Sequence, residues 1–403
     1  LHDALPILNS QKADDYTKEC KVCKHVGKVS EDGLCPLCSK IQKLSNNVLY
    51  SDFFSVVLEG EADGLPLPGG YLLLADDEKT LSKRMEKDSY FVRVYAKNQM
   101  YTGKHIATKL WVGDYTTGDT FEKFAQKAEG IKRIGVLRAD VDNLGQTFVA
   151  GFAGKYATLS RTAALSRQLS IFFKYYIRSI LKNGEYHIDG EKKLTERNAT
   201  IVYSGGDDVF IVGAWNEVIE LSIDLQEKFK KYTQGTLSIS SGIGIYECTY
   251  PIGAIANETG EMEAESKRMP EKDSVTLMDD GETHLINELE ICDGTYRWEE
   301  LYKSVLGEKY DVIQDFLGES DERGMSFLYR MLELIRNQKE KINFARFVYL
   351  LSRLEPDKEG EKKEKYRKFS RKMYQWVQSE KDCRELKTAI NLYAYMHREK
   401  GAH

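Results

Sequence analysis

Hydrophobic and polar positions divide the chain into stretches with different periods. From Asn46 to about Thr120, aromatic and β-branched runs alternate with Gly, Pro and Asp turns, which predicts mostly strands. From Ile131 to about Asp279, apolar runs typical of strands alternate with longer amphipathic segments typical of helices. From Trp298 onwards the pattern is helical throughout. The chain is therefore predicted to belong to the α+β class.

The middle stretch has the element order of a ferredoxin-like Palm, βαββαβ, with an additional helix and strand. Its first strand runs into Asp140, and a strand pair follows at Thr200–Tyr203 and Val209–Val212. The fourth strand is expected at Leu237–Tyr246. The predicted helices are Thr158–Leu181, Asn216–Tyr232 and Ile252–Arg268.

The flanking stretches have simpler patterns. The predicted strands of the β-rich stretch are Phe53–Leu58, Tyr71–Leu74, Tyr90–Tyr95 and Leu110–Val112, with a short helix at Phe121–Glu129. The helical end contains amphipathic stretches at Phe327–Gln338, Phe344–Leu354 and Tyr366–Glu380, with breaks at Gly318 and Pro356. We expect a zinc-binding region at 1–45, a β-rich linker at 46–130, the Palm at 131–285 and a helical bundle at 286–403.

The turn between the paired strands carries the most chemistry. It reads Ser204-Gly205-Gly206-Asp207-Asp208. Glycine lets the backbone approach a ligand closely, and adjacent aspartates can hold a divalent metal. The alternative is a solvated hairpin turn, since Gly and Asp are both turn formers.

A second acidic cluster follows the strand that begins at Ile134. Asp140 and Asp142 would share one face if the strand persists, because residues two apart in a strand point the same way. If the strand ends at Asp140, Asp142 falls in the turn and Asn143 can cap the next helix. The alternative is that these side chains only terminate the strand.

Together the two clusters predict a site for two Mg²⁺ or Mn²⁺ ions. Such ions lower the pKa of an attacking hydroxyl and neutralise charge that develops on a phosphate during in-line displacement. The sequence contains no obvious general base, and none is required if the metal activates the hydroxyl.

Two Cys-x-x-Cys pairs near the start, Cys20/Cys23 and Cys35/Cys38, predict a closed four-thiolate zinc site with a structural role. Two disulfides are disfavoured, since nothing indicates secretion. The remaining cysteines, Cys248, Cys292 and Cys383, are scattered and are expected to be buried or inert.

Composition narrows the class of protein further. The chain has 403 residues, 41% of them hydrophobic, and a net charge of −5, so its overall charge does not point to nucleic acid. We see no membrane span and no signal peptide, and expect a cytoplasmic protein.

Lys358–Lys372 is locally basic, either as a solvated helix or as a surface facing RNA or a partner. The dipeptide His2-Asp3 has no clustered His partners, so an HD nuclease is not expected from it, and the start without Met is interpreted as a fragment boundary or a processed end.

These motifs occur together in one family. The chain resembles the large subunit of type III CRISPR effector complexes, and it is most similar to the Csm type (III-A). The stretches that carry the resemblance are Gly113–Tyr115, Leu137–Gly145, Ser204–Asp208, Ser240–Gly244 and Phe344–Leu351. In that family the full subunit also has an HD nuclease domain and a first Palm. The resemblance implies that this chain begins near the end of that first Palm.

The resemblance implies cyclic oligoadenylate synthesis from ATP at the interface of the two Palms. The 3′-hydroxyl of one ATP would attack the α-phosphate of another and release pyrophosphate when target RNA pairs with the guide RNA. The implied partners are the two RNAs and neighbouring Csm-type subunits.

By matching to the family, Asp207 and Asp208 would hold metal together with Asp140. Gly205 and Gly206 would let the triphosphate lie against the backbone. The further nucleotide-binding candidates are Ser204, whose alternative is a turn-starting role, Asp142 and Asn143, with Glu258 and Lys267 as weaker candidates on a helix.

Two other readings stay open. A diguanylate-cyclase-like protein has a related hairpin on a Palm, although that family usually carries Gly-Gly-Asp/Glu-Glu-Phe and here Val209 follows Asp208. A non-catalytic scaffold would use the Palm to hold subunits and RNA.

Overall fold

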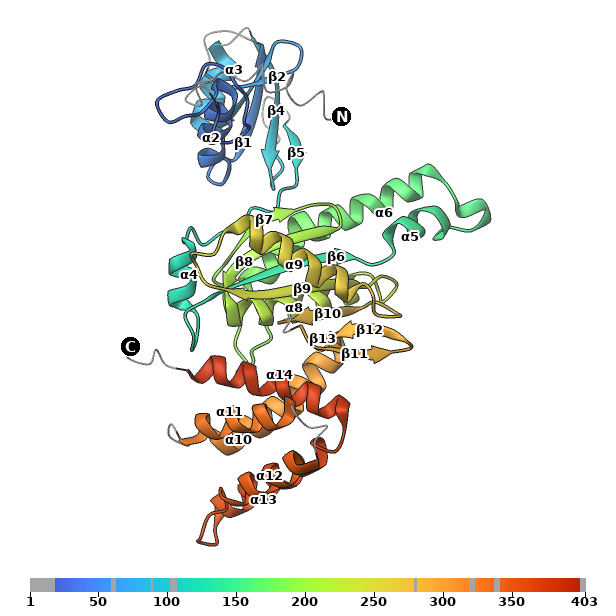
Figure 1. Ribbon diagram of the computed structural model, residues 1–403. Coiled ribbons are helices and arrows are strands. Elements are labelled where there is room, and N and C mark those ends of the chain that lie inside the picture. Colours follow the sequence, from blue (N-terminus) through green and yellow to red (C-terminus); the bar gives the residue numbers. More distant parts are fainter. Residues whose placement is uncertain are drawn as a thin grey trace, which may run out of the picture. The chain divides into compact units, whose positions relative to one another are not determined.

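The computed structural model describes residues 19–58, 63–87, 90–101, 107–278, 281–318, 323–336 and 341–398. His2-Asp3 lies outside the described residues. The chain divides into two compact units, Leu1–Asp114 and Tyr115–His403, and each is described by itself (Figure 1). The predicted α+β class is confirmed. No helix among the described residues is long and apolar enough to cross a membrane.

The first unit contains a five-stranded sheet in the order β2-β3-β1-β4-β5. Its strands are β1 (Phe53–Leu58), β2 (Leu65–Leu67), β3 (Tyr71–Asp76), β4 (Phe91–Lys97) and β5 (Thr108–Leu110). Helix α2 (Pro36–Val48) begins within the second cysteine pair, with Cys35 as its N-cap and Cys38 in its first turn, and helix α3 (Glu78–Lys87) connects β3 to β4.

Helix α3 was not predicted, because its residues are mostly polar. It needs only a narrow apolar stripe: Leu81 is fully buried and Met85 packs against the same small core one turn later. The side chain of Asp77 accepts a hydrogen bond from the backbone N–H of Thr80, at 2.7 Å, and so caps the helix start.

The second unit is built on a six-stranded sheet in the order β13-β10-β9-β6-β8-β7. Its strands are β6 (Ile134–Val141), β7 (Ala199–Ser204), β8 (Asp208–Ala214), β9 (Ile239–Tyr246), β10 (Ser274–Leu277) and β13 (Thr295–Arg297). The four strands β9-β6-β8-β7 pair antiparallel, in the order of a ferredoxin-like fold. The Palm predicted from the sequence is confirmed.

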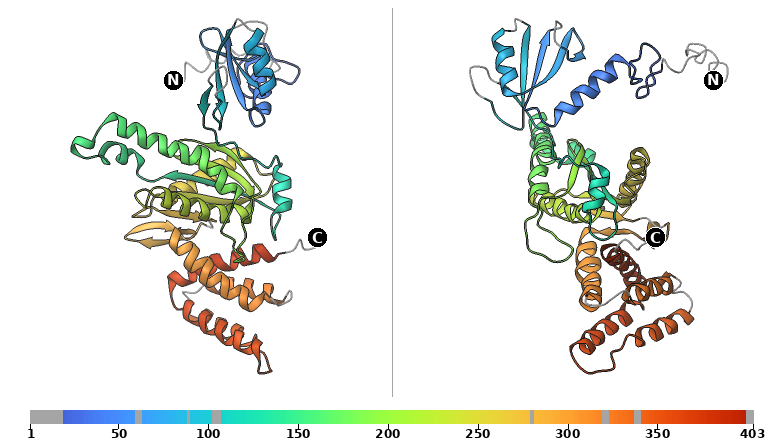
Figure 2. Two further views of the ribbon diagram at one scale, coloured as in Figure 1. Left: turned by 180° about the vertical axis from the view of Figure 1, so that it is seen from behind. Right: turned by 90° about the vertical axis from the view of Figure 1, so that its left-hand side faces the viewer.

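Helices cover both faces of this sheet (Figure 2). One face packs on α8 (Trp215–Tyr232) and on a long helical stretch made of α6 (Leu159–Ile171), a π-helical turn at Phe172–Tyr176 and α7 (Ile177–Lys182). The other face packs on α9 (Ile252–Ser266) and α4 (Phe121–Lys127). Helix α4 was assigned to the β-rich linker, but Phe124 and Ala125 are buried against the Palm sheet, so it belongs to the second unit.

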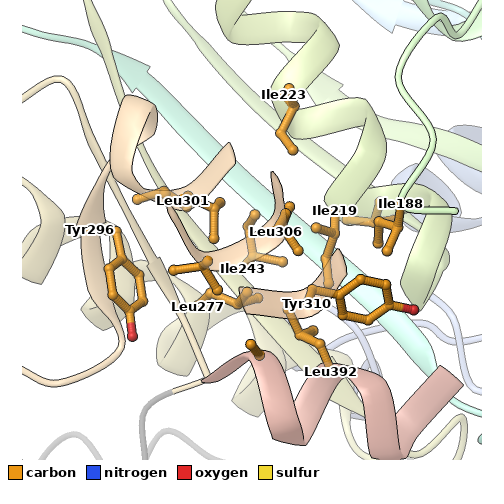
Figure 3. Packing of buried hydrophobic residues seen from close by; sticks show 14 of the residues in the cluster. Ile188, Ile219, Ile223, Ile243, Leu277, Tyr296, Leu301, Leu306, Tyr310 and Leu392 are labelled. Carbon is orange, nitrogen blue, oxygen red and sulfur yellow. The ribbon is translucent and has the colours of Figure 1, made fainter. Parts of the chain in front are cut away.

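The C-terminal helices share one hydrophobic core with the Palm, as Leu306, Tyr310 and Leu392 show beside Ile219 and Ile243 (Figure 3). The predicted helical end consists of a π-helical stretch at Glu300–Tyr310, α10 (Asp311–Leu317), α11 (Arg323–Arg336), α12 (Lys341–Ser352), α13 (Glu361–Trp376) and α14 (Glu380–His397). A hairpin of β11 (Thr283–Ile286) and β12 (Leu289–Cys292) precedes them. Strand β13 lies beyond the expected Palm limit at 285, yet it pairs with β10 in the Palm sheet.

Helix α14 also contacts the segment that leads into the first Palm strand, β6. The backbone N–H of Ile131 donates to the carbonyl of Tyr395, at 2.9 Å. Gly130 has φ +58°, and a Cβ on it would collide with the same carbonyl. A side chain at position 130 is therefore excluded by both conformation and contact.

A buried ion cluster positions the start of β7. Arg197 is fully buried and pairs with Glu220 and Asp224 of α8, the latter at 2.9 Å. Burial raises the pKa of Glu220 to about 7, although Arg197 opposes that shift. Because removing one partner would leave a buried unpaired charge, this cluster ties the hairpin strands to α8.

Candidate functional site

Two acidic residues lie opposite each other on neighbouring strands. In the register of β6 and β8, Asp140 is the direct partner of Asp208. Directly opposed residues project from the same face of a sheet. The alternation along β6, with Val136 buried against α4 and α9, places Asp140 on the face that α9 covers. Tertiary pairing therefore joins two motifs that are far apart in the sequence.

Asp207 lies in the turn beside this pair. Its carbonyl accepts from the backbone N–H of Val141, at 3.2 Å, which continues the strand pairing into the turn. Burial raises the pKa of Asp207, and the carboxylates of Asp140 and Asp208 raise it further, while Lys267 opposes the shift. The three aspartates therefore form one electrostatic cluster.

Lys267, at the end of α9, neutralises part of this cluster. Its ammonium group pairs with Asp140 and lies 2.7 Å from Glu263. Burial disfavours the charged lysine, but the hydrogen bonds to the two carboxylates outweigh it and raise the pKa of Lys267. Lys267 was a weaker candidate on the sequence, and the structure places it at the acidic cluster.

Sequence reasoning missed Glu263 and Arg138. Arg138 Nε lies 2.8 Å from Glu263, and Glu263 is buried to 7% exposure between Arg138 and Lys267. The i, i+4 spacing of Glu263 and Lys267 on α9, together with the i, i+2 spacing of Arg138 and Asp140 on β6, is the signal that could have found them. Glu258, in contrast, accepts from Tyr250 near the opposite end of β9 and does not join the cluster.

The two glycines of the turn differ in their surroundings. A Cβ on Gly205 would collide with the Asp208 carboxylate and lie 2.7 Å from the Tyr203 hydroxyl. A Cβ on Gly206 would meet only Ser170, at an ordinary 3.5 Å. A side chain at position 205 would therefore push aside the ends of the Asp208 and Tyr203 side chains, whereas Gly206 leaves open space above the backbone.

Ser204 makes a specific contact within the protein. Its hydroxyl donates to the carbonyl of Phe173, in the π-helical turn. The hydroxyl hydrogen is thus used inside the protein, so Ser204 can offer a ligand only its oxygen lone pairs.

The side chains of Asp142 and Asn143 mainly make hydrogen bonds within the protein. Strand β6 ends at Val141, and Asp142 is buried, with one carboxylate oxygen accepting from Ser238, at 2.7 Å, and from the N–H of Asp273, at 3.1 Å. Asn143 is the N-cap residue of α5 (Leu144–Ala150) with φ 53°, but its side chain bonds Lys272 instead of the helix N–H groups.

The acidic cluster has the donor chemistry of a divalent metal site. Carboxylate oxygens are the ligands that Mg²⁺ and Mn²⁺ prefer. Asp140, Asp207 and Asp208 are each partly exposed, and the turn is open at Gly206. Among the described residues, however, only the cysteines form a group of three or more such side chains within 4.8 Å of one another. Metal binding at the aspartates therefore remains a prediction.

The four cysteines are assembled as the spacing predicted. The sulfur atoms of Cys20, Cys23, Cys35 and Cys38 all lie within 4.8 Å of one another, and those of Cys23 and Cys35 are 3.7 Å apart. Tetrahedral zinc with bonds of about 2.3 Å would separate two thiolates by about 3.8 Å. Backbone N–H groups at positions 23 and 35 lower the pKa of Cys20 to about 6, which favours the thiolate. The cluster therefore fits zinc.

The basic segment Lys358–Lys372 is largely neutralised by acidic neighbours. Lys363 and Arg367 pair with Glu359, and Lys372 pairs with Glu308. This pattern supports a solvated helix over a surface that faces RNA.

A ferredoxin-like sheet with aspartates at the end of its first strand and at its central hairpin defines a Palm-domain protein. Residues 133–276 match the family described as Cas10/Cmr2, second palm domain, and residues 314–399 match the second helical domain of the CRISPR RNA silencing complex Cmr2 subunit. The chain belongs to the Cas10/Csm1 family of type III-A CRISPR subunits.

Curated relatives support this assignment over nearly the whole chain. The Cas10/Csm1 protein of Mycobacterium tuberculosis, named a single-strand-specific deoxyribonuclease, is 40% identical over 99% of the chain and 49% of its own length. The protein of the same name from Enterococcus italicus is 37% identical over 95% of the chain and 47% of its own length. The chain thus spans about half the length of the curated relatives that it matches.

Solved structures share the fold. Csm1 of T. onnurineus matches with a TM-score of 0.67 and 22% identity, over 88% of this chain and 50% of that one. A Csm1–Csm4 cassette in complex with pppApApA matches with a TM-score of 0.63 and 23% identity, over 89% of this chain and 51% of that one.

Proposed function

We propose that this chain carries the nucleotidyl-transfer Palm of a type III-A effector subunit and converts ATP into cyclic oligoadenylates when target RNA is bound. The observation that carries the proposal is the pairing of Asp140 with Asp208, with Asp207 in the adjoining turn. Support comes from related Csm1–Csm4 cassettes, which were solved in complex with ATP, with pppApA and with cA4.

In this proposal two Mg²⁺ or Mn²⁺ ions bound by Asp140, Asp207 and Asp208 would activate the 3′-hydroxyl and stabilise charge on the reacting phosphate. Lys267, which pairs with Asp140 and Glu263, would place a positive charge beside the reacting phosphates. The open space at Gly206 lets that triphosphate lie against the turn. A first Palm, a Csm4-type subunit, guide RNA and target RNA complete the assembly, which acts in the cytoplasm.

The test uses the chain assembled in its guide-RNA complex, with matching target RNA, labelled ATP and Mg²⁺ or Mn²⁺, and chromatography of the products. The complex should yield cyclic oligoadenylates only with target RNA, and the variant Asp207→Ala/Asp208→Ala should yield none. Glu258→Gln is the matched control, because Glu258 lies on α9 but outside the acidic cluster. If the intact, target-bound complex forms no product with either metal, the proposal is wrong and a scaffold role remains.

GTP in a parallel reaction separates the diguanylate-cyclase-like alternative. A cyclic dinucleotide from GTP, with no product from ATP, would assign the chain to that class.

A further inference from the structure

The segment Leu144–Gly184, here called the arm, connects the first two strands of the Palm. Its composition is unlike that of the rest of the chain, since it has six basic residues and not one Asp or Glu, while the whole chain has a net charge of −5. The basic residues are Lys155, Arg161, Arg167, Lys174, Arg178 and Lys182.

The outer part of the arm packs on the rest of its unit at only a few points, where Leu144, Phe148 and Leu165 are partly buried against the core. Helix α5 has no buried residue, and α6 buries only Leu169 near its end. Val149 and Leu159 are each 87% exposed. Figures 1 and 2 show α5 and the start of α6 projecting beyond the Palm sheet.

The cations of the outer arm have no acidic partners in the part of the chain that the structure describes. Lys155, Arg161 and Arg167 are exposed, and none of them forms an ion pair there. Two of them flank an exposed tyrosine: the guanidinium carbon of Arg161 is 4.4 Å, and the Lys155 nitrogen 5.3 Å, from the centre of the Tyr156 ring. The basic residues of α13 differ, because Lys363, Arg367 and others pair with carboxylates.

Unneutralised cations around an exposed aromatic ring are the combination that binds single-stranded nucleic acid. The phosphates contact the cations and a base stacks on the ring. An apolar protein partner would cover Val149 and Leu159, but it would leave the concentrated positive charge without a counter-charge. The charge pattern therefore favours a polyanion with stacking bases.

We propose that the arm binds a single-stranded nucleic-acid segment through Lys155, Arg161 and Arg167, with Tyr156 as the stacking platform. The arm begins directly after Asn143 and returns to the turn, where the carbonyl of Phe173 accepts the Ser204 hydroxyl. The proposal concerns binding alone, so it stands or fails independently of nucleotidyl transfer.

The test is fluorescence anisotropy of the full chain with a labelled 20-nucleotide RNA of mixed sequence, and with DNA of the same sequence, without ATP and over a range of salt. The variant Lys155→Gln/Arg161→Gln/Arg167→Gln should weaken binding at least tenfold. Loss of three phosphate contacts should also reduce the slope of log K against log salt by about 2. Tyr156→Ala should weaken binding by about fivefold or more, because stacking contributes ~1–3 kcal/mol per base.

The control variant Lys363→Gln/Arg367→Gln/Lys368→Gln removes the same charge from α13 and should change the affinity by less than twofold. Thermal unfolding checks that both triple variants are folded. Equal weakening by the two triples would mean that only net charge matters, and it would overturn the proposal. Unchanged binding by the arm variant, or no binding by the unmodified chain, would also overturn it and leave a protein as the occupant of the arm. Tighter binding of RNA than of DNA would identify RNA as the natural strand.

Discussion

The cysteine cluster and the aspartate cluster show two ways of bringing side chains that can bind metal together. The cysteines come from 19 consecutive positions, Cys20 to Cys38, and their sulfurs are already within 4.8 Å of one another. The aspartates come from β6, from the turn before β8 and from the first residue of β8, and Lys267 at the end of α9 pairs with Asp140. The first cluster is assembled by local chain geometry, whereas the second is assembled by the pairing of strands that are distant in the sequence.

The largest expected effect is at the cysteines. Cys35→Ser, or removal of zinc with a chelator, should remove the bound zinc and unfold the segment around the cluster, since structural zinc contributes about 10 kcal/mol or more to such segments. Zinc content by mass spectrometry and limited proteolysis at positions 19–48 would measure this. Cys248→Ser should retain zinc, and a stable segment without zinc would contradict the structural role.

The next largest effect distinguishes Asp140 from Asp142, two aspartates of one motif, by activity and by stability. Asp140→Asn should lower oligoadenylate synthesis by roughly 10²–10³-fold, because a lost metal ligand removes several kcal/mol of transition-state stabilisation. Stability should change little, since Asp140 is partly exposed.

Asp142→Ala should show the opposite pattern. It removes a buried acceptor of two hydrogen bonds and should cost about 1–3 kcal/mol of unfolding free energy. Urea unfolding and product assays on Asp140→Asn and Asp142→Ala test both expectations. Equal losses of activity and of stability in the two variants would refute the distinction between the two aspartates.

The two glycines give a smaller, matched comparison. Gly205→Ala should cost about 1 kcal/mol, because its Cβ would displace the Asp208 carboxylate and the Tyr203 hydroxyl, which are the ends of flexible side chains. Gly206→Ala should leave the unfolding free energy within about 0.5 kcal/mol, yet weaken ATP binding if the triphosphate lies over that position. Calorimetric unfolding and ATP titration distinguish these outcomes, and equal destabilisation by both changes would count against this account of the turn.

The smallest effect concerns the charge on Asp207. Its pKa is raised above the ordinary 3.8 by burial and by the neighbouring aspartates, so the folded state binds the proton more tightly than the unfolded state. This contribution to stability is lost as the pH rises through the raised pKa. Asp207→Asn should therefore stabilise the metal-free protein at neutral pH, by less than about 1 kcal/mol after solvent screening.

Mn²⁺ should reverse the order of stability of the unmodified protein and Asp207→Asn. The ion should raise the melting temperature of the unmodified protein more than that of Asp207→Asn, because only the former offers the full carboxylate set. Melting curves with and without Mn²⁺, at several pH values, measure both effects. A variant that gains as much as the unmodified protein from Mn²⁺ would exclude Asp207 as a ligand.

The sequence by itself determined the elements whose causes are local. The cysteine spacing, the hairpin at Gly205-Gly206 and the alternation of strands and helices predicted the zinc site, the turn and the Palm, since backbone preference and apolar period act over a few residues. Helix α3 was not predicted, because its apolar stripe is short.

Only the tertiary structure decided which distant groups meet. The register of β6 with β8 pairs Asp140 with Asp208, and the packing of α9 brings Glu263 and Lys267 to that face. Strand β13 and the shared core that joins the C-terminal helices to the Palm were decided the same way. Such contacts depend on complementary burial between segments far apart in the chain, which no local pattern records.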